Sequence, residues 1–266
     1  MPSESKETGT EMLMREIPVF RILVIAILLL ASSFFSHSAE ARENVVDYYR
    51  QLQQIQAFDL NYPLKKEGKG WVTRNLDWDS NIPVIVDVQA GYIFFSDEGT
   101  GGGNYETQIV LWRKSGGEPL IGISEVAYDP PYPDGSRLRF FEKDGKRWIE
   151  VTDFVVPGIS ISDFLAQDMT IGDLNALKAI GTRVYIALPR VGTTIRAYLV
   201  TKDSYANAVC NEEDWFVPGD PAPYLHYCKV LQNRVNNLIR IDWNKRQGQF
   251  TFGDKGRSAK VPWLSQ

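Results

Sequence analysis

The chain has 266 residues, with 29 Lys and Arg against 33 Asp and Glu, and a formal net charge of −4 at pH 7. Lysine and arginine form no block, so the sequence lacks the electrostatic pattern of a nucleic-acid-binding protein. All 7 tryptophans and all 12 tyrosines lie after residue 41. Aromatic residues favour strands, so this distribution predicts a β-rich core in that part of the chain.

The first 41 residues have the organisation of a secretory signal peptide: a basic region, an apolar run and a cleavage pattern. Arg15 and Arg21 precede the apolar run Ile22–Ala31, and the segment ends in Ala39-Glu40-Ala41, the A-x-A pattern that signal peptidase reads. The apolar stretch, extended to Phe35, is shorter than the roughly 20 residues that a membrane-spanning helix needs. We therefore expect residues 1–41 to be cleaved, leaving no permanent membrane anchor.

Residues 42–266 carry 26 basic and 28 acidic side chains, a net charge of −2. We expect one soluble β-rich domain, periplasmic or secreted, with a sub-boundary near residues 160–180. The chain has two cysteines, Cys210 and Cys228. In an oxidising compartment such a pair predicts a disulfide, worth about 3 kcal/mol through restriction of the unfolded chain. Two free thiols, or a redox pair, are the alternatives.

The spacing of apolar residues predicts the order of the elements. Helical spacing within Arg42–Phe58 predicts an N-terminal helix. Short β-type runs separated by turn residues then follow, which is typical of an antiparallel sandwich or a partly open barrel. An α+β fold is the alternative. Within Ile159–Lys178 we expect one or two short linking helices, with Ser162 as N-cap and an interruption at Gly172.

Turn residues predict three hairpins. In Arg137–Val151, Asp144-Gly145 predicts a type I′ turn, which needs positive φ at both central positions. The second hairpin is expected to pair Val184–Leu188 with Thr194–Val200, and the third to pair Leu238–Trp243 with Gln249–Phe252. Four further strands are expected at Val84–Val88, Tyr92–Ser96, Thr107–Arg113 and Leu120–Ile123.

Histidine is scarce after the signal segment, where His226 is the single example. A His-rich zinc site is therefore excluded, since one histidine and a paired set of cysteines cannot supply its ligands. A Ser-His-Asp triad would have to use His226, and no G-x-S-x-G motif accompanies it. We interpret His226 as structural, and we predict no catalytic residue and no metal centre.

The most conspicuous local feature is the glycine-rich segment Ser96–Asn104, which contains Asp97 and Glu98. A phosphate-binding loop would need a helix after it, and a P-loop would also need a lysine. A predicted strand follows instead, so we interpret the segment as a connection between antiparallel strands. The alternative is a loop that holds Ca²⁺ or a polar ligand through Asp97 and Glu98; no other cofactor is expected.

Two further clusters place acids beside tryptophan, as sugar-binding sites often do: Asp77-Trp78-Asp79 and Glu212–Trp215. No motif identifies a family. The sequence therefore favours a non-catalytic binding or accessory protein with a polysaccharide or protein partner. The alternative is a carboxylate-dependent hydrolase acting on glycans or cell-envelope material, which would need two facing carboxylates. The expected ligand contacts are Trp78, Asp79, Asp97, Glu98 and Trp215.

Overall fold

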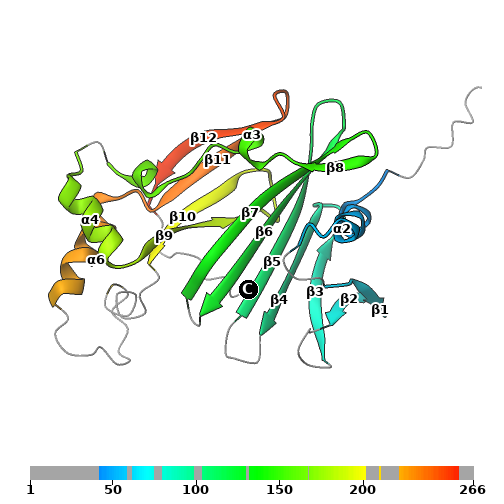
Figure 1. The fold of residues 1–266 in the computed structure, drawn as a ribbon, viewed down its shortest axis with the longest axis horizontal. Coiled ribbons are helices and arrows are strands. Elements are labelled where there is room, and N and C mark those ends of the chain that lie inside the picture. Colours follow the sequence, from blue (N-terminus) through cyan, green and yellow to red (C-terminus); the bar gives the residue numbers. More distant parts are fainter. Residues whose placement is uncertain are drawn as a thin grey trace, which may run out of the picture. The chain divides into compact units, whose positions relative to one another are not determined.

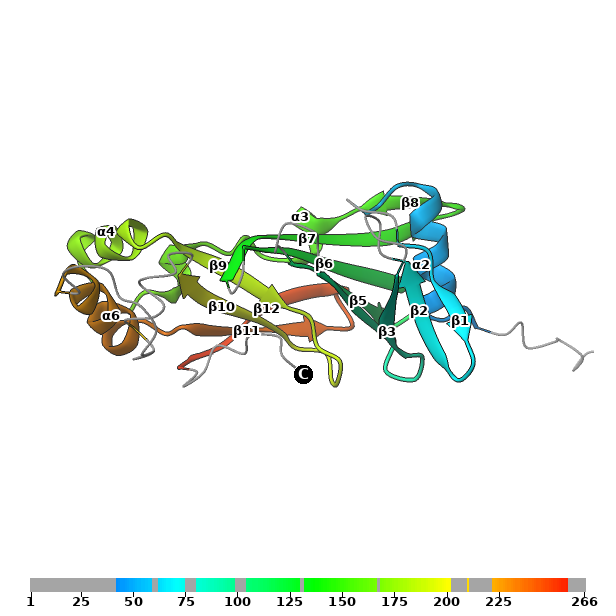
Figure 2. The ribbon, with the colours of Figure 1, turned by 90° about the horizontal axis from the view of Figure 1, so that it is seen from below.

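The structure is a computed structural model that describes residues 42–58, 62–74, 80–98, 104–129, 132–166, 168–201, 210 and 222–257. In this part of the chain, twelve strands form two antiparallel sheets, so the prediction of a mainly β fold is confirmed (Figures 1 and 2). All of them belong to one compact unit, Glu43–Gln266.

The larger sheet is a long meander, open rather than closed into a barrel. Each of its eight strands pairs with the next one in sequence, in the order β1 to β8 (Figure 1). The strands are β1 (Lys65–Glu67), β2 (Gly70–Arg74), β3 (Asn81–Asp87), β4 (Tyr92–Glu98), β5 (Asn104–Arg113), β6 (Pro119–Asp129), β7 (Tyr132–Asp144) and β8 (Arg147–Glu150).

The smaller sheet has four strands in the order β12-β11-β10-β9. Its two hairpins are the ones predicted from the turn residues, with ends shifted by a few positions. The strands are β9 (Thr182–Ala187), β10 (Ile195–Thr201), β11 (Leu238–Asn244) and β12 (Gln249–Gly256). Two serine hydroxyls of the long sheet donate hydrogen bonds to β9, the edge strand of the smaller sheet. Ser124 donates to the carbonyl of Ile186 at 3.1 Å, and Ser136 donates to the carbonyl of Val184 at 3.3 Å.

Helices connect and cover the sheets. The predicted N-terminal helix is α2 (Val45–Gln54), and Asn44 and Asp47 close a capping box at its start. The predicted linker contains a 3₁₀ turn, η1 (Ile161–Phe164), and α4 (Ile171–Ala179). Two helices were not predicted, α3 (Thr152–Val155) and α6 (Ala222–Arg234). No helix in the described ranges is long and apolar enough to cross a membrane.

The core lies on both faces of the long sheet. One face packs against α2, where Tyr49 and Leu52 contact a cluster that includes Ile109 and Ile121. The other face packs against the smaller sheet, and there Trp112, Phe140 and Phe250 form mutual ring contacts with centroids 5.3–5.6 Å apart. Burial on both faces explains why the central strands are apolar at successive positions and not only at alternate ones.

Three local predictions were wrong in detail: the position of one turn, the N-cap of the first linker helix and the interruption of the second. Asp144 pairs with Arg147, so the turn residues are Gly145 and Lys146. Gly145 has φ +61°, while Lys146 is not among the described non-glycine residues with positive φ, so the turn is type II′ rather than I′. The turn moves by one residue because type II′ needs glycine at its first central position.

The N-caps of the linker helices also differ from the prediction. Ser160, not Ser162, precedes η1, because its amide donates to the Asp163 carboxylate at 2.7 Å, three residues ahead. Thr170 caps α4 in the same way with Asp173, and the helix therefore begins before Gly172 instead of being interrupted by it.

Candidate functional site

Strands β3 and β4 are paired over only part of their length. Their pairing covers Ile85–Asp87 and Tyr92–Phe94. The earlier residues of β3 remain paired with β2, and the later residues of β4 remain paired with β5 as far as Glu98. In Figure 1 the two strands separate toward the start of β3 and the end of β4. Two strand edges therefore face each other here without a shared ladder.

A hollow of about 420 Å³ lies between these edges. Its volume falls in the range of small-molecule sites, about 300–1,000 Å³. It is open to one side rather than enclosed. The described residues that line it are Ser80, Asn81, Ile82, Pro83, Ser96, Asp97 and Glu98.

Pro83 accounts for the end of the ladder. The Leu111 amide donates to the Gly91 carbonyl at 2.8 Å, which fixes the alternation along β4: its odd residues bond to β5 and its even residues are directed toward β3. Extending the register from Ile85 and Phe94 places Pro83 opposite Ser96. Proline has no N–H to donate, so one of the two hydrogen bonds of the next rung is lost, and the pairing ends at Ile85 and Phe94.

Asp97 lies at the inner side of the hollow and is only 6% exposed. Its Oδ2 accepts a hydrogen bond of 2.7 Å from the hydroxyl of Tyr62. The Tyr62 carbonyl in turn accepts from the hydroxyl of Tyr49 at 2.5 Å and from the Gln53 side chain at 3.0 Å, both on α2. Asp97 is thus held in place from the N-terminal helix.

Tyr49 is suited to this role because its hydroxyl keeps its proton. Burial raises the pKa of Tyr49 well above its ordinary value of 10, and the negative charge of Glu125 raises it further. The hydroxyl therefore remains a donor at any physiological pH.

Glu98 belongs to the opposite, outer side and is exposed. Neighbouring residues of a strand point to opposite faces, so Asp97 and Glu98 do not face each other as a catalytic pair would. Ser96 donates to Asn104 at 2.7 Å, and the Asn81 amide donates to Glu67 at 3.3 Å. The described lining contains no lysine, arginine or aromatic side chain, so its charge is negative.

The sheet face that carries Asp97 continues as a buried polar row across β5 to β7. Thr107, Glu125 and Arg139 are 1%, 3% and 6% exposed. Arg139 pairs with Glu125, which neutralises both charges inside the protein. These side chains lie on the same face of the sheet as Asp97 but do not line the hollow.

The structure brings together two of the five predicted contact residues, Asp97 and Glu98. The other three, Trp78, Asp79 and Trp215, lie outside the described residues, as does the Glu212–Trp215 cluster. His226 is part of α6. Sequence analysis missed Pro83, Tyr62 and Tyr49. A proline within an apolar strand pattern was the one available signal, since it marks an interrupted ladder.

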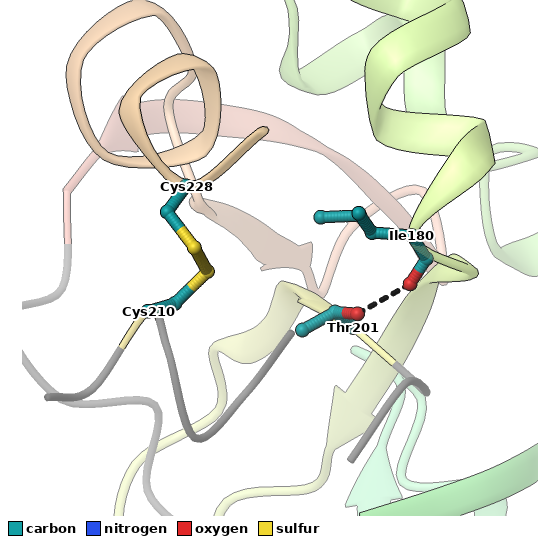
Figure 3. The surroundings of a disulfide bond; sticks show 4 residues. All are labelled: Ile180, Thr201, Cys210 and Cys228. Carbon is teal, nitrogen blue, oxygen red and sulfur yellow. Dashed lines mark hydrogen bonds between the residues drawn. A yellow bond between two sulfur atoms is a disulfide. The ribbon is translucent and has the colours of Figure 1, made fainter. Parts of the chain in front are cut away.

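The predicted disulfide between Cys210 and Cys228 is confirmed, with the two Cα atoms 5.1 Å apart. Figure 3 shows it joining the chain at Cys210 to helix α6, near the hydrogen bond that the Thr201 hydroxyl donates to the Ile180 carbonyl. Among the described residues, no group of three or more His, Cys, Asp or Glu side chains could hold a metal ion. Calcium binding through Asp97 and Glu98 stays a prediction.

No protein-family model matches the chain, and no curated protein matches it. Among solved structures, a domain of an uncharacterized protein from Porphyromonas gingivalis W83 is similar, with a TM-score of 0.44 and 14% sequence identity. The similarity covers 78% of this chain and 88% of that domain.

Proposed function

We propose that the chain is an exported, non-catalytic binding or accessory protein of the periplasm or cell surface, which holds its ligand in the hollow between β3 and β4. The observation that carries the proposal is the hollow itself, bounded by two of the three acids predicted as ligand contacts, Asp97 and Glu98. The buried carboxylate is oriented by Tyr62, so part of the site is organised before any ligand arrives.

Export is supported by the sequence of the first 41 residues and by the disulfide, which is compatible with an oxidising compartment. The test is expression of the full chain in a bacterial host, followed by fractionation and mass spectrometry of the product. We expect a periplasmic species that begins at Arg42. Ala41→Arg should block cleavage, whereas Glu40→Gln, at the tolerant middle position, should not. Cleavage that is indifferent to Ala41→Arg would refute the signal.

Binding is tested with the exported protein on arrays of glycans and of peptides. The informative variant is Glu98→Lys, which reverses the charge at the open side of the hollow. Its matched control is Asp254→Lys on β12, an exposed strand acid remote in sequence from the hollow. We expect Glu98→Lys to abolish the array signal and Asp254→Lys to preserve it. Array signals that are equal in both variants, or absent altogether, contradict the proposal.

A further inference from the structure

The two edges that border the hollow are strand edges, and this geometry restricts the shape of a ligand. On one side, β3 is paired with β2 through Asn81 and Arg74. On the other side, β4 is paired with β5 through Glu98 and Asn104. Both edges are therefore held in extended conformation by their outer neighbours while they stay apart from each other.

The backbone of β4 is directed into the opening. By the alternation that the Leu111–Gly91 hydrogen bond fixes, the N–H and C=O groups of Ser96 and Glu98 point toward β3 and not toward β5. On the β3 side Pro83 cannot donate. Main-chain donors and acceptors of β4 thus face a space that a neighbouring strand would normally occupy.

We propose that this hollow binds an extended peptide of a partner protein, which adds as a short strand between β3 and β4. This inference rests on the proposed binding function and names its ligand class. Main-chain hydrogen bonds to Ser96 and Glu98 supply affinity, as in other cases of strand addition. An inserted strand would lie about 4.8 Å from the edge of β4.

The charge of the site selects the side chains of the peptide. Asp97 and Glu98 line the hollow, and its described lining includes no cation. A lysine-bearing peptide therefore complements it, while an acidic one meets like charges. Asp97 is buried and fixed by Tyr62, whereas Glu98 is exposed, so Glu98 is the side chain that can be changed without disturbing the fold.

The test is fluorescence anisotropy of the exported full-length protein with a labelled, capped Thr-Lys-Val-Lys-Thr peptide. Two control peptides replace lysine by glutamate (Thr-Glu-Val-Glu-Thr) or the central valine by proline (Thr-Lys-Pro-Lys-Thr). We expect each control peptide to bind at least about tenfold more weakly, through charge repulsion and through loss of a main-chain donor. Glu98→Lys should weaken the lysine peptide similarly, and Asp254→Lys should not.

A second variant tests the hollow itself. Pro83→Val restores an N–H opposite Ser96, so the β3–β4 ladder can extend and close the hollow. We expect loss of peptide binding together with a thermal midpoint at or above that of the wild type, and protection of the new Val amide from hydrogen exchange. Peptide binding that survives a protected amide at this position overturns the inference.

The outcomes separate this inference from the proposed function. If glycans on the array depend on Glu98 but the lysine peptide does not bind, strand addition is wrong and a binding role at the hollow stands. If the proline peptide binds as well as the valine peptide, the interaction is not main-chain pairing, and the inference also fails. If neither glycans nor peptides depend on Glu98, both proposals fall.

Discussion

The hydroxyl of Tyr62 donates a 2.7 Å hydrogen bond to Oδ2 of Asp97, and the two residues are 2% and 6% exposed. This contact spans 35 positions of sequence and joins the segment that follows α2 to the end of β4. Asp97 therefore depends on a donor from another part of the chain for its orientation in the hollow.

Tyr62→Phe should lower the free energy of unfolding by about 2 kcal/mol, the usual value for a buried hydrogen bond to a charged group. Tyr49→Phe, which removes a neutral bond to the Tyr62 carbonyl, is the matched control and should cost about 1 kcal/mol. Urea unfolding followed by tryptophan fluorescence measures both. A smaller loss for Tyr62→Phe than for Tyr49→Phe would mean that Asp97 does not rely on this donor.

The buried pair of Glu125 and Arg139 should behave as a unit. Glu125→Leu or Arg139→Met alone leaves a charge inside the protein and should cost about 3–5 kcal/mol. The double variant replaces both charges by apolar side chains and should recover most of that loss. A double-mutant cycle in urea gives the coupling energy, and additive losses would argue against the pair.

The disulfide between Cys210 and Cys228 closes a loop with a sequence separation of 18. The chain-entropy model gives a stabilisation of about 3 kcal/mol for a loop of this length. We expect a reducing agent to lower the urea midpoint accordingly, and the Cys210→Ser, Cys228→Ser double variant to match the reduced wild type. A midpoint indifferent to reduction would show that the fold does not need this link.

Tyr92 should make the protein sensitive to alkali. Its pKa is raised to about 12, mainly by burial. The positive charge of Arg190 offsets part of this rise, and the negative charge of Glu106 adds to it. In the unfolded chain Tyr92 ionises near its ordinary pKa of 10. The contribution of neutral Tyr92 to the free energy of unfolding is therefore fully present below pH 10 and is lost as the pH rises toward 12. The loss should be about 2–3 kcal/mol. Tyr92→Phe should flatten this part of the stability profile, and an unchanged slope would contradict the assignment.

Gly122 lies at a close approach in the core between the sheets. A Cβ at this position would lie 2.7 Å from the Trp112 ring and 2.8 Å from the Phe140 ring. Gly122→Ala should therefore cost about 1–3 kcal/mol through overpacking. Gly158→Ala, where a Cβ would meet nothing within 4 Å, is the control and should be nearly neutral. Equal thermal midpoints for the two variants would contradict this packing.

The fold was predictable wherever a strong turn signal separated two alternating runs. The hairpin of β11 and β12 follows this pattern, with apolar Ile239 and Ile241 on one side and a polar turn after Asn244. The strands β1 and β2 escaped detection because the three residues of β1 are all exposed and carry no alternation. Helix α6 escaped because its first residues include Pro223, although proline is tolerated in the first turn of a helix.

The candidate site was predictable only in part, for a physical reason. Asp97 and Glu98 stood out because a glycine-rich segment follows them directly. The effect of Pro83 depends on which residue lies across from it, and strand register is not encoded in any local window. The contribution of Tyr62 depends on a contact between segments 35 positions apart, which periodicity along the chain cannot reveal.

Two other strand edges show how this chain avoids unwanted self-association. The edge strand β1 is composed of Lys65, Lys66 and Glu67, whose charges disfavour stacking against another copy. At β9, the carbonyls of Val184 and Ile186 already receive the hydroxyls of Ser136 and Ser124. Neither edge is therefore a good template for pairing with a strand of another copy of the chain.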